Sequence, residues 1–333
     1  MASDQVLRKL PVVKIFSCYA APGFGLVEAW KRRLTNVPFE VLDHKNPEKA
    51  LVHLQDAEVI LADPDLIGAM FHHLPKTKWV QSTWAGIEKM VKQVDPKDLP
   101  PPFSYTRLGL GLRTSMAEYV IGHMIAHERH FYEQMKAQEQ KSWREANYRT
   151  LGHLTIGIIG MGDSGGEIAR LCKAFGMNVW GLGRRNLSPE KKSKHMDEYR
   201  QLSGLAELLA NCDYICNVLP QTQATTDLLS GDVLSSCIKQ PVFINIGRGN
   251  VISEDSIVRA LDKGWISHAI LDVFRTEPLP SSSPLWSSPK VTITPHVGGD
   301  TFPHAIIDIM EVNYNRYING EPLRYTVDWE AGY

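Results

Sequence analysis

Three charged side chains in the last third of the sequence have the types that acid–base work on a small acid requires. Arg248 follows an apolar run in INIGRGNVI, and its guanidinium could hold a carboxylate through two hydrogen bonds and polarise the adjacent carbonyl. His296 lies in VTITPHVGG and Glu277 in LDVFRTEPLP. A histidine that donates a proton near neutral pH needs a partner that holds its tautomer and charge. Together the three residues indicate hydride-transfer chemistry at the carboxyl edge of a sheet. Taken alone, Arg248 would be interpreted as a surface arginine that caps a turn, and His296 as an ordinary loop histidine.

A glycine-rich loop supplies the second signal. Gly160-x-Gly162-x-x-Gly165 closes an apolar run, 154–159, and precedes a helical pattern over 167–175. In that setting the first glycine makes the tight turn, the second admits a pyrophosphate and the third lets helix and strand pack closely. Ser164 departs from the usual apolar residue without removing a phosphate donor. The alternative is that the three glycines match the motif by chance and form a turn that binds no dinucleotide. The predicted cofactor loop comprises Gly160, Met161, Gly162, Asp163, Ser164 and Gly165.

The end of the next apolar run, NVWGL, predicts which dinucleotide is preferred. NAD-specific folds place an acid about 20 residues after the glycine loop, to accept hydrogen bonds from the ribose. Here Gly183, Arg184 and Arg185 occupy that stretch, and no acid occurs between Glu167 and Glu190. A guanidinium could bind a 2′-phosphate, so we expect NADP(H) to be preferred, with NAD(H) possible. The alternative is that the two arginines belong to a solvent-exposed basic loop with no role in cofactor binding. That loop also contains Lys191, Lys192 and Lys194.

The elements that must position these residues alternate between β-branched runs and helical periods. The first series is VVKIFSCY, FEVLDH, EVILAD and KWVQST; the second is LTIGIIG, NVWGL, DYICNVL, VFINIG, SHAILDV and VTITPH. A proline-rich linker over 95–102 separates them, because consecutive prolines fit neither a helix nor a central strand. Long helices are predicted over 115–144 and 303–317. The pattern predicts an α/β protein with two doubly wound parallel sheets.

Composition excludes several classes of protein. The chain has 333 residues, 43% of them hydrophobic, and a net charge of −1, which gives no broad field for nucleic acid or an anionic membrane. No apolar run approaches the roughly 20 residues of a membrane span, and the first residues do not resemble a signal peptide. We therefore expect a cytoplasmic protein. Cys212 and Cys216 are expected on one face of a strand, in the core, and the stripe of His123, His127 and His130 on a packed or subunit-contacting helix; no metal is expected.

The motifs LGHLTIGIIGMG, NIGRG, DVFRTEPLPSSSPLWSSPKVTITPHVGG and VDWEAGY resemble those of the D-isomer-specific 2-hydroxyacid dehydrogenases, most closely the glyoxylate/hydroxypyruvate reductase A type. The resemblance covers nearly the whole chain. It implies a discontinuous, flavodoxin-like substrate domain, 1–102 and 298–333, with a Rossmann cofactor domain, 103–297, inserted into it. The family's order of glycine loop, Arg, Glu and His matches Arg248, Glu277 and His296 as catalytic residues.

The resemblance also assigns further site residues. The substrate carboxylate would meet Arg248 and the backbone of Trp84, Ala85, Gly86 and Ile87, although Trp84 and Glu88 depart from the usual loop. The segment 116–119 resembles the start of a dimer-forming segment. A homodimer is predicted, since the long helix and Trp143 would otherwise expose much apolar surface. Besides the glycine loop and the arginines after NVWGL, the implied cofactor contacts are Leu219, Pro220, Thr222, Ile246, Gly247, Arg248, Asp272, His296 and Gly298.

The predicted function is NADPH-dependent reduction of small 2-oxo acids, such as glyoxylate or hydroxypyruvate, to D-2-hydroxy acids. His296 would donate the proton, Glu277 would hold the imidazole and Arg248 would bind the carboxylate. Two alternatives stay open. One is a family member that acts on another small acid. The other is a dinucleotide-sensing binding protein, like the family's transcriptional corepressors, which oxidation of NADPH by glyoxylate would distinguish.

Overall fold

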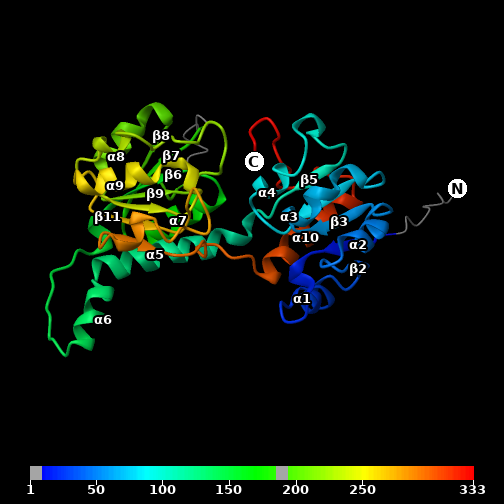
Figure 1. Ribbon diagram of the computed structural model, residues 1–333, viewed down its shortest axis with the longest axis horizontal. Helices are drawn as coiled ribbons and strands as arrows, with labels where there is room; N and C mark the ends of the chain where they lie inside the picture. Colours follow the sequence, from blue (N-terminus) through cyan, green and yellow to red (C-terminus); the bar gives the residue numbers. More distant parts are fainter. Residues whose placement is uncertain (1–9, 185–193) are drawn as a thin grey trace. The chain divides into compact units, whose positions relative to one another are not determined.

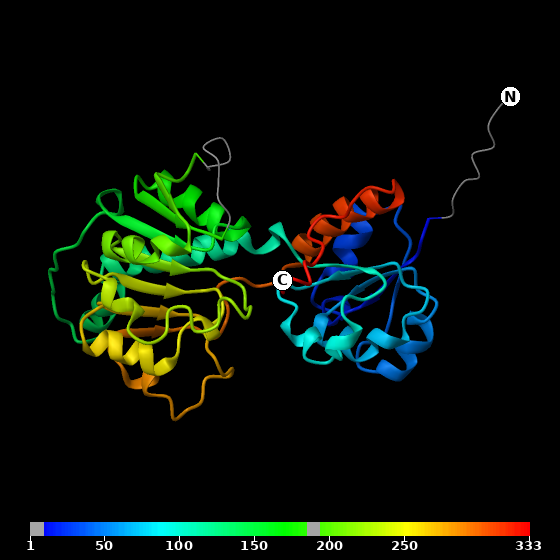
Figure 2. The ribbon, with the colours of Figure 1, turned by 90° about the horizontal axis from the view of Figure 1, so that it is seen from above.

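The computed structural model describes residues 10–184 and 194–333 and divides the chain into two compact units. Unit 1 comprises Met1–Leu112 and Thr301–Tyr333, and unit 2 comprises Arg113–Asp300 (Figures 1 and 2). The predicted fold class, two parallel-sheet α/β domains with one inserted into the other, is confirmed. The predicted boundary at residue 102 precedes the end of the first segment of unit 1 because Ser104–Thr106 is the edge strand of the first sheet, and the predicted boundary at residue 298 lies three residues before Thr301.

Unit 1 is built on a parallel sheet of five strands in the part of the chain that is described, ordered β2-β1-β3-β4-β5. This is the flavodoxin-like order, with a switch point between β1 and β3. Helices α1 and α10 pack on one face, and α2, α3 and α4 on the other. The strands are β1 (Val13–Phe16), β2 (Phe39–Val41), β3 (Val59–Ala62), β4 (Trp79–Ser82) and β5 (Ser104–Thr106). The helices are α1 (Leu26–Arg33), α2 (Pro47–Leu54), α3 (Pro64–Ile67), α4 (Glu88–Val91) and α10 (Pro303–Ile318).

Unit 2 contains a parallel sheet ordered β12-β11-β10-β9-β6-β7-β8, seven strands among the described residues. This order reverses between β6 and β9, as in Rossmann folds. Helices α5 and α7 cover one face, and α8 and α9 the other (Figure 2). The strands are β6 (Thr155–Ile159), β7 (Asn178–Leu182), β8 (Glu198–Arg200), β9 (Tyr214–Asn217), β10 (Val242–Asn245), β11 (His268–Leu271) and β12 (Val291–Ile293). The helices are α5 (Arg113–Glu128), α6 (Phe131–Glu139), α7 (Asp163–Ala174), α8 (Leu205–Asn211) and α9 (Glu254–Asp262).

Local sequence explains where these elements begin. In α9, Ser253 is the N-cap and its hydroxyl accepts a hydrogen bond from the Ser256 N–H. Glu254 and Asp255 lie in the first turn, where the helix dipole stabilises negative charge. Helix α10 begins at Pro303, whose missing N–H costs nothing at that position. The central strands are buried on both faces, as parallel strands between helix layers must be.

Three expectations about elements were wrong. The predicted helix over 115–144 ends at Glu128, because His130 takes a left-handed conformation with φ 54°, and a separate α6 follows. Strands β5 and β8 were missed because each has only three residues at a sheet edge, and β8 reads Glu-Tyr-Arg. Cys212 and Cys216 are both fully buried, but against opposite faces of the sheet, since Cys212 precedes the strand as the C-cap of α8.

In the described ranges, no helix combines the length and the apolar character that crossing a bilayer demands.

Candidate active site

The glycine loop of unit 2 joins β6 to α7 at the point where the strand order reverses. Gly160 has φ 110°, which L side chains rarely adopt. A Cβ at Gly165 would lie 2.0 Å from the carbonyl oxygen of Gly160, so helix and turn pack backbone to backbone. A Cβ at Gly162 would meet nothing within 4 Å, which leaves open space beside the N-terminus of α7. These features fit a bound pyrophosphate, the group for which the motif was predicted.

Helix α7 begins at Asp163 rather than at the predicted residue 167. Asp163, Ser164 and Gly165 therefore form its first turn, with Met161 and Gly162 in the preceding loop. The Asp163 carboxylate lies at the positive end of the helix dipole, where it stabilises the helix.

The residues predicted to determine which dinucleotide is preferred follow strand β7. Gly183 packs against Tyr199, since a Cβ there would lie 2.4 Å from the phenol oxygen. Arg184 is exposed directly after Gly183. Arg185, Lys191 and Lys192 lie outside the described residues. A cation thus follows β7 where an NAD-specific fold would place an acid.

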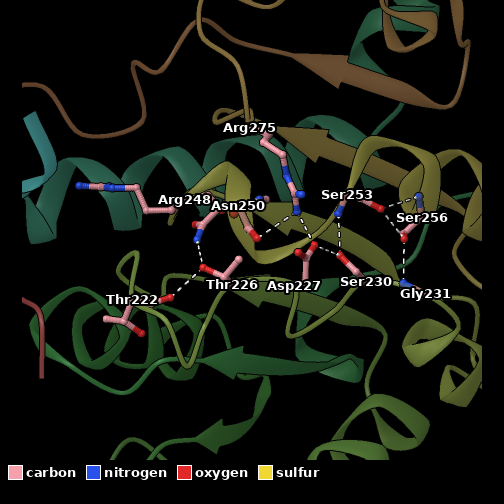
Figure 3. Close-up of polar contacts among 11 residues, drawn as sticks. Thr222, Thr226, Asp227, Ser230, Gly231, Arg248, Asn250, Ser253, Ser256 and Arg275 are labelled. Carbon is pink, nitrogen blue, oxygen red and sulfur yellow. Dashed lines mark hydrogen bonds and ion pairs between the residues drawn. The ribbon is translucent and has the colours of Figure 1, made fainter. Parts of the chain in front are cut away.

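The turn that carries Arg248 follows β10. The Arg248 guanidinium donates from Nη1 to the Gly247 carbonyl oxygen at 2.8 Å, and Figure 3 shows the side chain extending away from the polar residues around Asp227. Two glycines fix the turn between neighbouring segments. A Cβ at Gly247 would lie 2.7 Å from the Leu219 carbonyl oxygen, and a Cβ at Gly249 would lie 1.9 Å from the Phe274 carbonyl carbon. The turn is therefore wedged between the backbone after β9 and the backbone after β11.

His296 and Glu277 are brought together at the ends of β12 and β11. His296 Nδ1 lies 2.8 Å from Glu277 Oε2, and Glu277 Oε1 accepts the Phe274 N–H at 2.9 Å. Burial acts to raise the pKa of Glu277, but the hydrogen bonds and the charges of His296 and Arg248 outweigh it and lower that pKa. Glu277 is therefore an anion well placed to hold the imidazole by Nδ1, with Nε2 left for another partner.

Asp272 fixes the loop that presents His296. Its Oδ1 accepts from the Thr294 hydroxyl at 2.6 Å and from the Val297 N–H at 2.9 Å, and its Oδ2 accepts from the Gly298 N–H at 2.8 Å. His296 itself has φ 56°, and its N–H donates to the Asp272 carbonyl oxygen at 2.8 Å. The predicted contact of Asp272 with the nicotinamide stays a prediction, whereas its hold on the histidine loop is direct.

The segment after β9 runs beside the glycine loop. A Cβ at Gly160 would lie 3.2 Å from Leu219, so the two segments are adjacent. Thr225 ties the segment into a compact turn, since its hydroxyl donates to the Pro220 carbonyl oxygen at 2.7 Å and accepts the Thr222 N–H at 2.9 Å. Leu219, Pro220 and Thr222 thus lie next to the loop predicted to hold the pyrophosphate. Ile246 is buried behind the Arg248 turn.

In unit 1 the loop Trp84–Ile87 follows β4. Trp84 is held by Ser82, whose Oγ accepts the Trp84 N–H at 3.0 Å, and by the Leu108 N–H, which donates to the Trp84 carbonyl oxygen at 2.8 Å. Lys89 Nζ lies 4.7 Å from the centroid of the Trp84 ring. Ala85 and Gly86 are half-buried and Ile87 is buried. Arg248 belongs to unit 2, so its predicted partnership with this loop stays a prediction.

Sequence reasoning missed Asp63, which anchors that loop. Asp63 is 1% exposed and accepts from Ser17 Oγ at 2.6 Å, Thr83 Oγ1 at 2.5 Å and the Cys18 N–H at 2.8 Å. It therefore ties the ends of β1, β3 and β4 together. An acid at the end of the apolar run EVILAD was the available signal.

Comparisons with known proteins agree with this geometry. The family model described as D-isomer specific 2-hydroxyacid dehydrogenase, NAD binding domain, matches residues 121–298. Glyoxylate/hydroxypyruvate reductase A of Serratia proteamaculans is 33% identical over 264 residues, which cover 78% of this chain and 82% of that protein.

Solved structures extend the likeness to almost the whole chain. A probable 2-hydroxyacid dehydrogenase from Rhizobium etli, in complex with NADP, has a TM-score of 0.80 at 28% identity and covers 98% of this chain and 100% of its own. An NADPH-dependent glyoxylate/hydroxypyruvate reductase from Sinorhizobium meliloti, also in complex with NADP, has a TM-score of 0.80 at 27% identity, with 97% and 100% covered. As its motifs predicted, the chain belongs to the D-isomer-specific 2-hydroxyacid dehydrogenase family and is an NAD(P)-dependent oxidoreductase.

Proposed function

We propose that this enzyme reduces small 2-oxo acids, of the size of glyoxylate or hydroxypyruvate, to D-2-hydroxy acids. The observation that carries the proposal is the 2.8 Å contact between His296 Nδ1 and Glu277 Oε2. Gly249 packs the Arg248 turn against the Phe274 backbone of the same segment that presents Glu277. A proton donor and a carboxylate clamp for one small substrate are thereby supplied by neighbouring strand ends.

The three side chains divide the work. Arg248 holds the substrate carboxylate and stabilises negative charge as it develops on the adjacent oxygen. His296 donates its proton from Nε2 to the carbonyl oxygen, because Nδ1 is engaged by Glu277. Glu277 stabilises the charged imidazole before that transfer. When bound, the reduced nicotinamide supplies the hydride for C2 of the acid.

We infer that NADP(H) is preferred and that NAD(H) is a weaker alternative. The support is Arg184 directly after β7, together with the NADP complexes of the Rhizobium etli and Sinorhizobium meliloti proteins. Arg184→Ala should weaken NADPH by about 1.5–3 kcal/mol, the scale of a hydrogen bond to a charged group, and leave the KM for NADH nearly unchanged. Equal losses with both cofactors would contradict this assignment.

We also assign a share of substrate recognition to unit 1, whereas unit 2 binds the cofactor and supplies Arg248. The support is the anchored loop Trp84–Ile87 in unit 1 and the glycine loop in unit 2. Because Ser82 Oγ accepts the Trp84 N–H, the loop would meet a carboxylate with the backbone of residues 85–87, and its contribution would be orientation rather than proton transfer.

We further propose a homodimer in the cytoplasm. Helix α6 and the segment after it expose several large apolar side chains: Phe131, Tyr132, Met135 and Tyr148 are roughly half exposed, and Trp143 is 93% exposed. Large apolar side chains left exposed along one segment in this way are typical of a subunit interface. Light scattering at micromolar concentration should give twice the 37.4 kDa chain mass, and a mass of one chain would overturn the dimer. All five cysteines are free thiols, as in reducing compartments.

The function is tested by a panel of 2-oxo acids measured with NADPH and with NADH. We expect oxidation of NADPH on addition of glyoxylate or hydroxypyruvate, and D-2-hydroxy acid as the product by chiral chromatography. A chain that binds NADPH tightly but oxidises it with no member of the panel would be a dinucleotide-sensing binding protein instead.

A further inference from the structure

Three segments of unit 2 converge on a single carbonyl group, that of Asn250. Its oxygen accepts the Asp227 N–H at 2.9 Å and Arg275 Nη2 at 3.3 Å (Figure 3). The Arg275 guanidinium also forms an ion pair with the Asp227 carboxylate, which accepts the Ser230 hydroxyl at 2.6 Å. We call Asp227, Asn250 and Arg275 the carbonyl clamp.

Two members of the carbonyl clamp are close in sequence to residues of the proposed site. Asn250 is two residues after Arg248, and Arg275 is two residues before Glu277. Asn250 Nδ2 donates to the Thr226 hydroxyl at 2.7 Å, and that hydroxyl donates to the Thr222 carbonyl oxygen at 2.8 Å. The clamp therefore joins the segment beside the glycine loop, the Arg248 turn and the Glu277 segment.

The Arg248 turn and the Glu277 segment also pack backbone against backbone. A Cβ at Gly249 would lie 1.9–2.4 Å from backbone atoms of Phe274 and Arg275, so a small displacement of one segment is felt directly by the other. Asp227 has φ 57°, a left-handed conformation that Asp and Asn tolerate better than most residues. The residue that forms the ion pair with Arg275 therefore has a less favoured backbone conformation.

The exposure of the ion pair argues for a role in geometry. The side chains of Asp227 and Arg275 are 48% and 45% exposed, and ion pairs at such positions contribute little to the free energy of unfolding. Arg275 and Ser230 lower the pKa of Asp227, so the carboxylate stays charged through the neutral range. The pair is therefore present under the conditions in which the enzyme works.

We propose that Asp227 and Arg275 are positioning residues, which hold the Arg248 turn and the Glu277 segment at a fixed separation through the Asn250 carbonyl. The inference rests on the proposed roles of Arg248 and Glu277. Without the clamp, the guanidinium and the Glu277–His296 pair lose their mutual alignment, although every catalytic side chain is still present.

The test uses Asp227→Asn, which preserves the left-handed backbone and removes the charge, and Arg275→Gln. The matched control is Arg259→Gln, which breaks another exposed ion pair of unit 2, between Arg259 and Asp232 at 3.0 Å. We expect each clamp variant to raise the KM for glyoxylate and lower kcat severalfold, and to move the alkaline limb of the pH–rate profile. The double variant should be no worse than the more affected single variant, because both act through one contact. Arg275→Lys should restore most of the activity.

A second readout does not depend on turnover. Hydrogen exchange at 248–252 and 274–278 should be faster in both clamp variants and unchanged in Arg259→Gln. A wild type that reduces no 2-oxo acid would defeat the proposed function, whereas faster local exchange in the variants would still support the clamp. Kinetic constants and pH profiles within twofold of wild type in both clamp variants would overturn the positioning role, even if exchange were faster.

Discussion

Each of the two sheets has a buried aspartate at the carboxyl end of a strand, and in each case the carboxylate holds a neighbouring loop. Asp63, after β3, binds Ser17, Cys18 and Thr83; Asp272, after β11, binds Thr294 and the N–H groups of Val297 and Gly298. Both residues are 1% exposed and have three or more donors. The same device therefore fixes a loop at the carboxyl edge of both units.

The loops differ in what they present. The loop held by Asp63 continues into Trp84–Ile87, whose polar groups are backbone amides and an indole. The loop held by Asp272 presents His296, and beside it Glu277, with side chains 46% and 36% exposed. A buried carboxylate thus fixes a loop in each unit, and the proposed proton transfer falls to the partly exposed pair of unit 2. The comparison predicts that changes at the edge of unit 1 alter substrate recognition alone, whereas changes at the edge of unit 2, which also carries Arg248, alter the chemical step as well.

Replacing His296 by Ala should have the largest effect. The substitution removes the proton donor but not the glycine loop or Arg184. We expect kcat to fall by roughly 10²–10⁴, with NADPH affinity kept, as measured by quenching of tryptophan fluorescence. A near-normal kcat would show that His296 is not the proton donor. The proposed difference between the carboxyl edges of the two sheets would then be wrong.

Arg248→Lys should have the next largest effect, although it keeps the charge. An ammonium cannot reproduce the planar two-point grip of a guanidinium on a carboxylate. We expect kcat/KM for glyoxylate to fall roughly 10–150-fold, which corresponds to about 1.5–3 kcal/mol of charged hydrogen bonding. If steady-state kinetics give values close to wild type, the carboxylate is held elsewhere.

Glu277→Gln sharpens the assignment of proton transfer to unit 2. The pKa of Glu277 is below its usual range, so its carboxylate is charged above that range and loses its pairing only as pH falls through the lowered pKa. Removal of the anion that faces the proposed proton donor should move the alkaline limb of the pH–rate profile for reduction to lower pH. An unmoved limb would show that the pair does not act as a unit.

The sequence predicted the parts of this molecule that are local or periodic. The long buried strands and the turn at Gly160–Gly165 have strong patterns of their own, so the fold class and the dinucleotide loop could be found. His296 and Glu277 could be paired because both follow strong strand signals. The short edge strands β5 and β8 contain too few apolar residues to be recognised as strands. No pattern in the sequence predicts that His130 takes the left-handed conformation that follows the end of α5.

Contacts between distant segments were beyond the sequence for a different reason. Asp227 and Arg275 are 48 residues apart, and an Asp and an Arg in two loops have no pattern that pairs them. Asp63 and Ser17 are 46 residues apart and become neighbours only because β1 and β3 are adjacent at the switch point of the first sheet. The order of the strands, which single-sequence periodicity does not give, decides both contacts.

Asp63→Asn tests the other half of the comparison and should have the smallest effect on turnover. In Asp63, Oδ1 accepts from the Ser17 and Thr83 hydroxyls and Oδ2 accepts from the Cys18 N–H. Asn keeps the shape of the side chain but replaces one of these oxygens by an amide NH₂, which cannot accept a hydrogen bond. One buried donor then loses its acceptor, at a cost of roughly 1–3 kcal/mol in the free energy of unfolding. Because Thr83 precedes the loop Trp84–Ile87, we expect the KM for glyoxylate to rise severalfold while kcat and the alkaline limb stay near wild type. Asp65→Asn, which removes an exposed charge from the same segment, is the control for charge alone. A fall in kcat with an unchanged KM would mean that the first edge contributes to the chemical step, and the division between the two edges would be wrong.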